Sequence, residues 1–202
     1  MRTGDVRNVP YGVAMENVWS EELCAQLDWH WRAQLRPRLD GLTDDEYVWE
    51  PVPDCWSIRP TEQVRTSKSS GSGPFRSEYE RPDVPQPTPV TTIAWRIGHI
   101  ITDCLLQRSA AHFGGEPFDR DTFAYAGTAD EALALLDAAY DRWITGAAAL
   151  GDRINEPCGP AEAPYDESPL GSLVLHINRE LIHHGAEIAL LRDLYLRLGR
   201  SS

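Results

Sequence analysis

A carboxylate and an imidazole stand one helical turn apart in the long segment from Ser168 to Leu198. Ser168 followed by Pro169 predicts a helix start with a hydroxyl cap and proline at the first helical position. At 3.6 residues per turn, the apolar residues of this segment share one face. They are Leu173, Ile177, Leu181, Ile188, Leu191, Tyr195 and Leu198. Glu180 and His184 fall on that same face, where burial demands a polar partner.

Two interpretations of Glu180 and His184 follow from this placement. Side chains at i and i+4 are neighbours on a helix, so both can reach one divalent ion. One oxygen and one nitrogen donor suit zinc, nickel, iron or manganese better than calcium. The alternative is a hydrogen-bonded Glu–His pair in a polar core, without a metal. Two ligands do not make a site, so the metal hypothesis requires a third donor from another helix; His183 is predicted to point away from it.

Length and charge restrict the class of protein. The chain has 202 residues, and we treat residues 1–202 as a single domain. Its formal net charge of −12 argues against nucleic acid or an anionic membrane as partner. No apolar run reaches the ~18 residues that cross a bilayer, and the N-terminus lacks a secretory-type stretch, so we expect a cytoplasmic protein. The four cysteines form no C-x-x-C pair and are expected to be free thiols, mostly buried.

Apolar periodicity predicts four long helices. They lie near residues 18–40, 90–113, 129–149 and 169–198. Hydroxyl residues supply the expected caps, Ser20 for the first helix, Thr91 or Thr92 for the second and Thr128 for the third. Pro37 is expected to kink or end the first helix near Arg36.

Residues 66–89 interrupt this pattern, because they are rich in serine, glycine and proline. We predict an irregular surface loop, which is either a lid or wall of a site or a tolerated insertion. No segment has a convincing strand pattern. The predicted fold is therefore all-α, a four-helix bundle with a long irregular loop between helices 1 and 2.

His99 in the second helix is the natural third donor. Metal sites in helix bundles are built from inward residues on facing helices, and His99 lies at the rim of the apolar face. Asp103 follows it by four residues and could orient its ring. The alternatives are a satisfied boundary histidine and a solvent-exposed aspartate. Tryptophans are numerous, and Trp49, Trp56 and Trp95 are predicted to form an aromatic wall beside the site.

The sequence resembles the DinB-like superfamily of metal-binding four-helix bundles. The resemblance rests on TTIAWRIGHI at 91–100 and HINRELIHHGAEI at 176–188. DDEYVWEPVPDCWSIRP at 44–60 also looks like the loop before the second helix in actinobacterial members. The family pattern implies metal ligands at His99, Glu180 and His184. Glutamate replaces the usual histidine at 180, a substitution that is known in mycothiol-dependent maleylpyruvate isomerases of the same superfamily.

The resemblance also implies an activity. Relatives include S-transferases that use mycothiol or bacillithiol, so we expect a thiol S-transferase that activates a low-molecular-weight thiol at one divalent metal, zinc first, against a small electrophile. Three protein ligands with an open position are typical of a catalytic site.

Two other functions remain open. One is metal-dependent hydrolysis, with His176 or Glu187 beside the metal as general base. The other is a non-catalytic metal-binding or dimerising bundle, and a homodimer is compatible with each of the three. The shape of the space above the metal discriminates among them.

Overall fold

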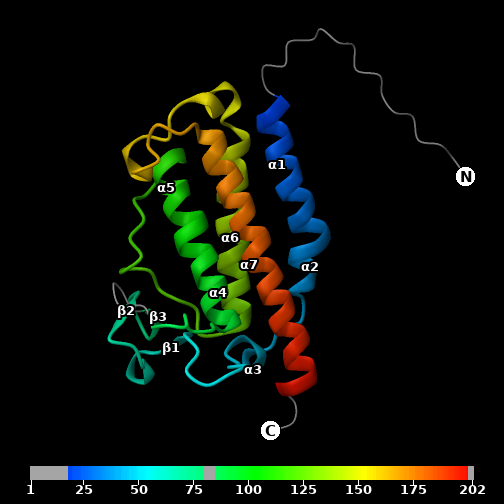
Figure 1. The fold of residues 1–202 in the computed structure, drawn as a ribbon, viewed down its shortest axis with the longest axis vertical. Coiled ribbons are helices and arrows are strands. Elements are labelled where there is room, and N and C mark those ends of the chain that lie inside the picture. The colour runs from blue at the N-terminus through cyan, green and yellow to red at the C-terminus, as the bar shows by residue number, and fades with distance from the viewer. Residues whose placement is uncertain (1–17, 80–84, 200–202) are drawn as a thin grey trace, which may run out of the picture.

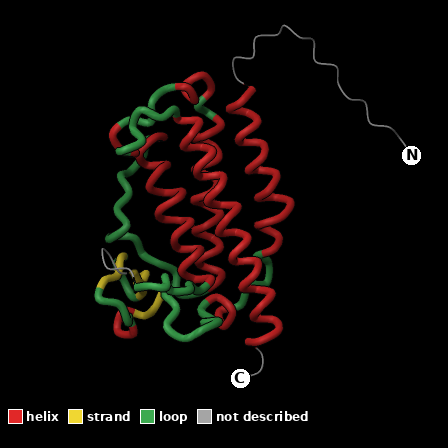
Figure 2. The backbone as a smooth tube through the Cα atoms, viewed as in Figure 1, coloured by secondary structure: helices red, strands yellow, loops and turns green. Residues whose placement is uncertain are grey.

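Four helical stretches lie side by side in the computed structural model, which describes residues 18–79 and 85–199 (Figures 1 and 2). The first stretch is α1 Val18–His30, η1 Trp31–Leu35 and α2 Arg36–Arg38. The second is α4 Ile93–His99, η3 Ile100–Leu106 and α5 Gln107–Phe113. The third is α6 Ala129–Ala148 and the fourth is α7 Leu170–Leu198. The predicted bundle is confirmed, and the largest boundary difference is a second stretch that begins at Ile93 instead of residue 90.

Hydroxyl caps define the starts of two of these stretches. Thr92 accepts a hydrogen bond from the Trp95 N–H, and Thr128 accepts one from the Glu131 N–H, as predicted. The predicted cap at Ser168 is wrong, because the residue before α7 is Pro169. The first helical N–H, of Leu170, instead donates to the Glu156 carbonyl at 2.8 Å. A backbone carbonyl of the preceding connection therefore takes the place of the Ser168 hydroxyl as acceptor.

The start of the first stretch also differs from the prediction. Ser20 is a buried residue inside α1, which already includes Val18, so it does not cap that helix. Further along, η1 is a π-helical turn in which the Arg36 N–H donates to the Trp31 carbonyl. Pro37 therefore sits in the first turn of α2, where its missing N–H is tolerated, and the helix ends at Arg38.

A small antiparallel sheet shows that the all-α prediction was wrong. Its strands are β1 Ile58–Pro60, β2 Lys68–Ser70 and β3 Phe75–Tyr79, in the order β1-β3-β2. Ile58 pairs with Ser77, and Ser70 pairs with the same residue from the other side. Two of the strands lie within the segment predicted as irregular, 66–89, of which residues 80–84 fall outside the described part. The sheet lies beside the end of the bundle where α4 begins (Figure 1).

One buried carboxylate holds strand β3 to the residues around it. Glu78 is 1 % exposed and accepts hydrogen bonds from the backbone N–H groups of Ser57 and Arg65 at 3.0 and 2.6 Å. The Arg59 guanidinium completes the arrangement, with Nε 2.9 Å from the Glu78 carboxylate. Since these partners come from 13 to 21 residues away, local composition could not reveal the sheet.

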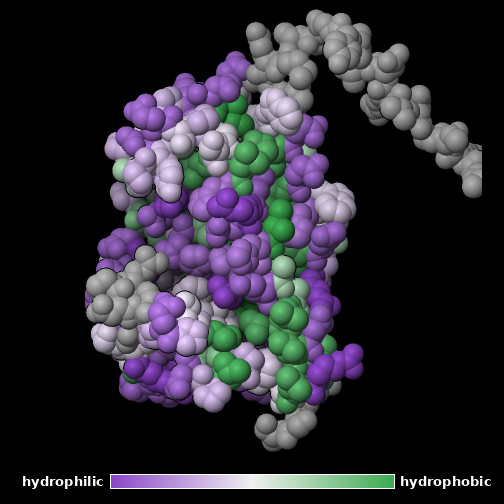
Figure 3. Space-filling view, in the orientation of Figure 1, coloured by the Kyte–Doolittle hydropathy of each residue, from purple (hydrophilic) through white to green (hydrophobic). Residues whose placement is uncertain are grey.

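Short helical turns fill the connections between the long helices. They are α3 Asp44–Tyr47, η2 Thr61–Gln63, η4 Gly151–Asn155 and η5 Pro160–Glu162. The core between the four stretches is apolar and aromatic, and Trp31 stacks on Tyr140 with ring centroids 4.0 Å apart. Polar side chains cover most of the face in Figure 3, with apolar patches between them. Leu175 and Leu190 of α7 are among the exposed apolar side chains. Among the described residues, no helix is long and apolar enough to cross a membrane.

Replacing Gly146 with alanine is expected to destabilise the bundle. Glycine inside a helix usually costs about 1 kcal/mol relative to alanine, so the substitution would ordinarily stabilise α6. Here a Cβ would lie 2.0 Å from Cδ2 of the Phe113 ring, which is too close for any real contact. We expect a loss of about 1–3 kcal/mol in the free energy of unfolding, measured by urea denaturation. Thr145→Ala, at the exposed neighbouring position, is the control, and an unfolding midpoint for Gly146→Ala at or above wild type would contradict the packing argument.

Candidate metal centre

The second and fourth helical stretches bring the predicted ligands together in the middle of the bundle. His99 ends α4, while Glu180 and His184 lie one turn apart on α7. The His99 and His184 rings are 4.8 Å apart, centroid to centroid, at 86° to each other. His184 Nε2 lies 3.3 Å from Glu180 Oε2. The three residues named from spacing and resemblance are therefore neighbours in space.

Cys104 belongs to the same group, although no spacing or motif predicted it as a ligand. Its Sγ lies 3.9 Å from His99 Nε2. One ligand atom each from His99, Cys104 and Glu180 lie within 4.8 Å of one another. We call His99, Cys104, Glu180 and His184 the donor cluster.

Both imidazoles of the donor cluster are held through Nδ1 by a carboxylate. His99 Nδ1 is 2.9 Å from Asp103 Oδ2, and His184 Nδ1 is 2.7 Å from Glu187 Oε2. We therefore assign the ring proton to Nδ1 in each case, which leaves the Nε2 lone pair free to bind a metal. This carboxylate–histidine arrangement is the one that orients histidine ligands in metalloproteins.

Arginines hold these two carboxylates in turn. Arg120 Nη1 lies 3.1 Å from Asp103 Oδ1, and Arg96 Nε lies 3.1 Å from Glu187 Oε2. Burial acts to raise the pKa of Asp103, but the hydrogen bond with His99 and the charge of Arg120 outweigh it and lower that pKa. Burial is likewise outweighed at Glu187, whose pKa is lowered by His184 and Arg96. Both orienting carboxylates are therefore ionised near neutral pH.

His184 itself has a lowered pKa. Burial disfavours the imidazolium, and this outweighs the hydrogen bond with Glu187, which favours it. The neutral ring is the form that binds a metal. The donor set of two imidazoles, a carboxylate and a thiol fits a divalent transition metal.

The two residues predicted as general bases differ in their availability. Glu187 is engaged by His184 and Arg96, and its other oxygen lies 3.3 Å from His183 Nε2, so its position is that of an orienting group. His176 is half-exposed and lies 3.6 Å from Glu180 Oε1, with Arg179 Nη2 2.5 Å from its Nδ1. His183 is exposed and reaches the outer side of Glu187. His183, His184 and Glu187 also have ligand atoms within 4.8 Å of one another, but this group uses the side of His184 that Glu187 occupies.

An aromatic cavity of about 500 Å³ opens beside His99. Its lining residues include Trp56, Tyr79, Trp95, His99, Asp103 and Arg120. Trp95 stacks on the His99 ring with centroids 5.2 Å apart, and Trp56 lies 6.2 Å from Trp95. Two of the three tryptophans predicted as a wall therefore line this cavity. Trp49 instead packs edge-on against Tyr195, 5.6 Å away, and does not line it.

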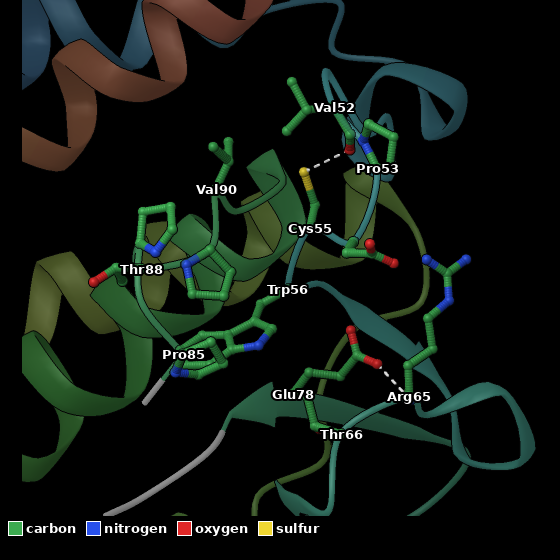
Figure 4. Close-up of a pocket in the computed structure, with 13 residues that line it drawn as sticks. Val52, Pro53, Cys55, Trp56, Arg65, Thr66, Glu78, Pro85, Thr88 and Val90 are labelled. Atoms are coloured by element: carbon green, nitrogen blue, oxygen red, sulfur yellow. Dashed lines mark hydrogen bonds between the residues drawn. The ribbon is translucent and has the colours of Figure 1, made fainter. Parts of the chain in front are cut away.

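Two further cavities adjoin the aromatic cavity. The arginine cavity, of about 680 Å³, shares Gln107 and Arg108 with it and carries His176 and Arg179 on its wall. The proline cavity, of about 460 Å³, shares Trp56, Glu78 and Thr88 with it. Figure 4 shows Trp56, Pro85, Glu78 and Arg65 among the residues that line the proline cavity, with the hydrogen bond from the Arg65 N–H to Glu78 as a dashed line. The segment between the first two helical stretches therefore contributes walls to the space beside the donor cluster.

Asp103→Asn is expected to weaken metal binding by about 10–100-fold, because loss of an orienting carboxylate typically costs that much. The amide keeps the size of Asp103 but loses the charge that holds His99 and Arg120. Zinc affinity would be measured by competition with a chromogenic chelator. Asp141→Asn, at an exposed position of α6, should leave affinity unchanged. Equal affinities in both variants would show that Asp103 does not orient the ligand.

Comparison with known proteins identifies the family of this chain. No curated protein and no solved structure matches the chain. A sequence profile of the DinB superfamily matches residues 26–188. Those residues span all four helical stretches in part or whole and contain the entire donor cluster. Because the match covers most of the chain, this protein belongs to the DinB superfamily.

Proposed function

We propose that this protein is a metal-dependent S-transferase that joins a low-molecular-weight thiol to a small electrophile. His99 Nε2, a Glu180 oxygen and His184 Nε2 would hold the ion. Zinc is the first choice for such a set, with nickel, iron and manganese as further candidates. When bound, a divalent ion acts as a Lewis acid that lowers the pKa of a thiol or water in its open position.

The observation that carries the proposal is a pair of neighbouring cavities, of which the aromatic cavity is lined by His99 of the donor cluster. A transfer between two substrates needs room for both, and the aromatic and arginine cavities share Gln107 and Arg108 at their junction. Trp56 and Trp95 offer flat apolar surface to an electrophile. Arg108 and Arg179 offer hydrogen-bond donors to the polar groups of a thiol cosubstrate. We propose mycothiol for that role in a host that makes it, and a cytoplasmic site of action.

The protein residues also set the conditions for the reaction. Asp103 and Glu187 hold the two imidazoles in fixed orientations, so their Nε2 atoms need no rearrangement to bind the ion. The stacked Trp95 ring covers one side of His99 and reduces access of water to it. A sealed site would have supported a purely structural role, whereas a cavity reaches His99 here.

Metal-assisted hydrolysis is the second candidate, and one observation favours it. His176 lies on the wall of the arginine cavity, 3.6 Å from Glu180, where it could accept a proton from an attacking water. Glu187 is less suited to that role, because His184 and Arg96 already engage it.

Two assays on the zinc-loaded protein separate these functions. Thiol consumption would be followed with model electrophiles, and ester or amide hydrolysis would be followed without thiol. Zinc-dependent thiol consumption that is lost with a chelator supports the transferase. Zinc-dependent hydrolysis that ignores thiol would overturn the transferase in favour of the hydrolase, with His176→Ala as the variant expected to abolish it. Inactivity in both assays over a broad substrate panel would support the non-catalytic alternative, a metal-binding or homodimeric bundle.

A further inference from the structure

Cys104 occupies a position that the proposed three-ligand site does not use. It is 4 % exposed, and its Sγ lies 3.9 Å from His99 Nε2, the nitrogen that Asp103 leaves free. His99, Cys104 and Glu180 each offer one ligand atom, and these three atoms lie within 4.8 Å of one another. A nitrogen, an oxygen and a sulfur donor from three side chains therefore surround one small volume.

The π-helical turn η3 creates this proximity. In a regular α-helix, residues 99 and 104 would point about 140° apart, given 3.6 residues per turn. Within η3 the backbone bonds from i+5 to i, as in the bond from the Gln107 N–H to the Thr102 carbonyl. The wider turn brings the fifth residue back toward the side of the first, so Cys104 lies beside His99. Single π-helical turns occur frequently at functional sites.

A buried cysteine is often only a small apolar side chain, and Cys55 illustrates that case. The Cys55 thiol donates to the Val52 carbonyl at 3.1 Å and lies in no group of metal-binding side chains among the described residues. Cys104 differs, because its sulfur faces a ligand-competent imidazole nitrogen and a carboxylate. Packing alone accounts for the burial of Cys104, but it does not account for these two neighbours.

We propose that Cys104 is a fourth protein ligand of the divalent ion, which gives a His₂-Glu-Cys donor set. This inference rests on the metal of the proposed function and deepens it. A thiolate ligand favours zinc over manganese, so the set narrows the choice of metal. The Cys104 thiol would release its proton to solvent on binding the ion.

The direction from which the Cys104 sulfur would approach the ion leaves room for a substrate. Cys104 is part of the apolar core and does not line the aromatic cavity, whereas His99 does. Its sulfur would reach the ion from the core side, and the cavity side would stay accessible. Zinc can expand to five ligands during a reaction, so a fourth protein ligand does not exclude an incoming thiol.

X-ray absorption of the zinc-loaded wild-type protein tests the proposal directly. The buffer must contain a phosphine reductant in place of thiols, so that any sulfur belongs to the protein. We expect one sulfur at about 2.3 Å together with nitrogen and oxygen at about 2.0–2.2 Å. A coordination shell of nitrogen and oxygen alone would overturn the proposal, and this measurement needs no variant that might fail to fold.

Cobalt substitution identifies which cysteine supplies the sulfur. The wild-type protein loaded with Co²⁺ should show a near-ultraviolet thiolate-to-cobalt charge-transfer band. Cys104→Ala and Cys104→Ser should lose this band but still bind cobalt through His99, Glu180 and His184. Cys24→Ala, which removes a buried thiol from α1, should keep it. A band that survives in both Cys104 variants would overturn the assignment.

The outcomes also separate this inference from the proposed function. Cobalt uptake without the band overturns Cys104 ligation but leaves the S-transferase proposal intact. A Cys104-dependent band in a protein that consumes no thiol leaves the ligand assignment standing and overturns the transferase. Failure of the wild-type protein to take up any divalent ion overturns both.

Discussion

His184→Ala is expected to abolish zinc binding and thiol transfer together while the bundle stays folded. The variant removes one of the two Nε2 donors that face Glu180. Loss of an orienting group alone costs about 10–100-fold in metal affinity, so loss of the ligand itself should exceed about 100-fold. The measurements are zinc stoichiometry after gel filtration and the rate of thiol consumption. Circular dichroism should show unchanged helix content, because the apolar core of α7 does not depend on this ring.

His183→Ala is the matched control for this experiment. It removes an imidazole from the adjacent position of the same helix. His183 is exposed, and it contacts Glu187 at 3.3 Å and lies with its ring 4.8 Å from the His184 ring, but it is not one of the proposed ligands. We expect zinc content within about twofold of wild type, since substitutions of exposed residues that make no buried contact usually have small effects. If His183→Ala lost the metal and His184→Ala kept it, His183 would be the ligand and the assignment of His184 would be wrong.

Arg192→Ala is expected to reduce the free energy of unfolding by about 3–5 kcal/mol, because it leaves the buried Glu46 carboxylate without its cationic partner. Glu46 is 4 % exposed, and Arg192 contacts its carboxylate through Nε at 2.7 Å and Nη2 at 3.2 Å. Arg192 Nη1 also donates to the carbonyls of Arg38 and Asp40. This one side chain therefore joins α7 to α3 and to the end of the first helical stretch. Urea denaturation of the purified variant provides the measurement.

A double variant tests how much of this loss in the free energy of unfolding comes from the unpaired Glu46 carboxylate. Replacing a buried ion pair with apolar residues of similar size is often neutral or stabilising. Glu46→Met combined with Arg192→Met should therefore recover much of the stability that Arg192→Met loses alone. If the double variant were no more stable than Arg192→Met, the two carbonyl contacts of Arg192 would carry the effect instead of the ion pair.

The helical part of the fold was predictable because its signals are local. Apolar periodicity located the four stretches, and hydroxyl residues such as Thr92 and Thr128 marked two of their starts. The sheet was not predictable, because its order depends on Glu78 pairing with distant backbone and arginine groups. Ser168 failed as a cap for a similar reason, since the Glu156 carbonyl takes the helical N–H first.

The positions of three candidate ligands were predictable, whereas the groups around them were not. Spacing placed Glu180 and His184 together, and the facing helix of the predicted bundle added His99. Glu187 was predicted as a general base, whereas in the structure it contacts His184 directly and pairs with Arg96 from another helix. Asp103 is paired with Arg120, which follows it by 17 residues outside the helix. Cys104 was missed because a helical wheel assumes 3.6 residues per turn, and the turn that carries it is wider.

The place of α7 in the chain order determines when the donor cluster can assemble during synthesis. His99 and Glu180 are 81 residues apart (180 − 99), so at 5–20 residues per second the ribosome needs about 4–16 s to supply the second after the first. Until then Leu35 lacks Gly185, against which it packs in the folded protein. Incomplete bundles expose apolar surface and are prone to aggregate. If the proposed ion binds at this cluster, it can bind only after α7 has been synthesised, so it cannot stabilise the first three helical stretches before the fourth has formed.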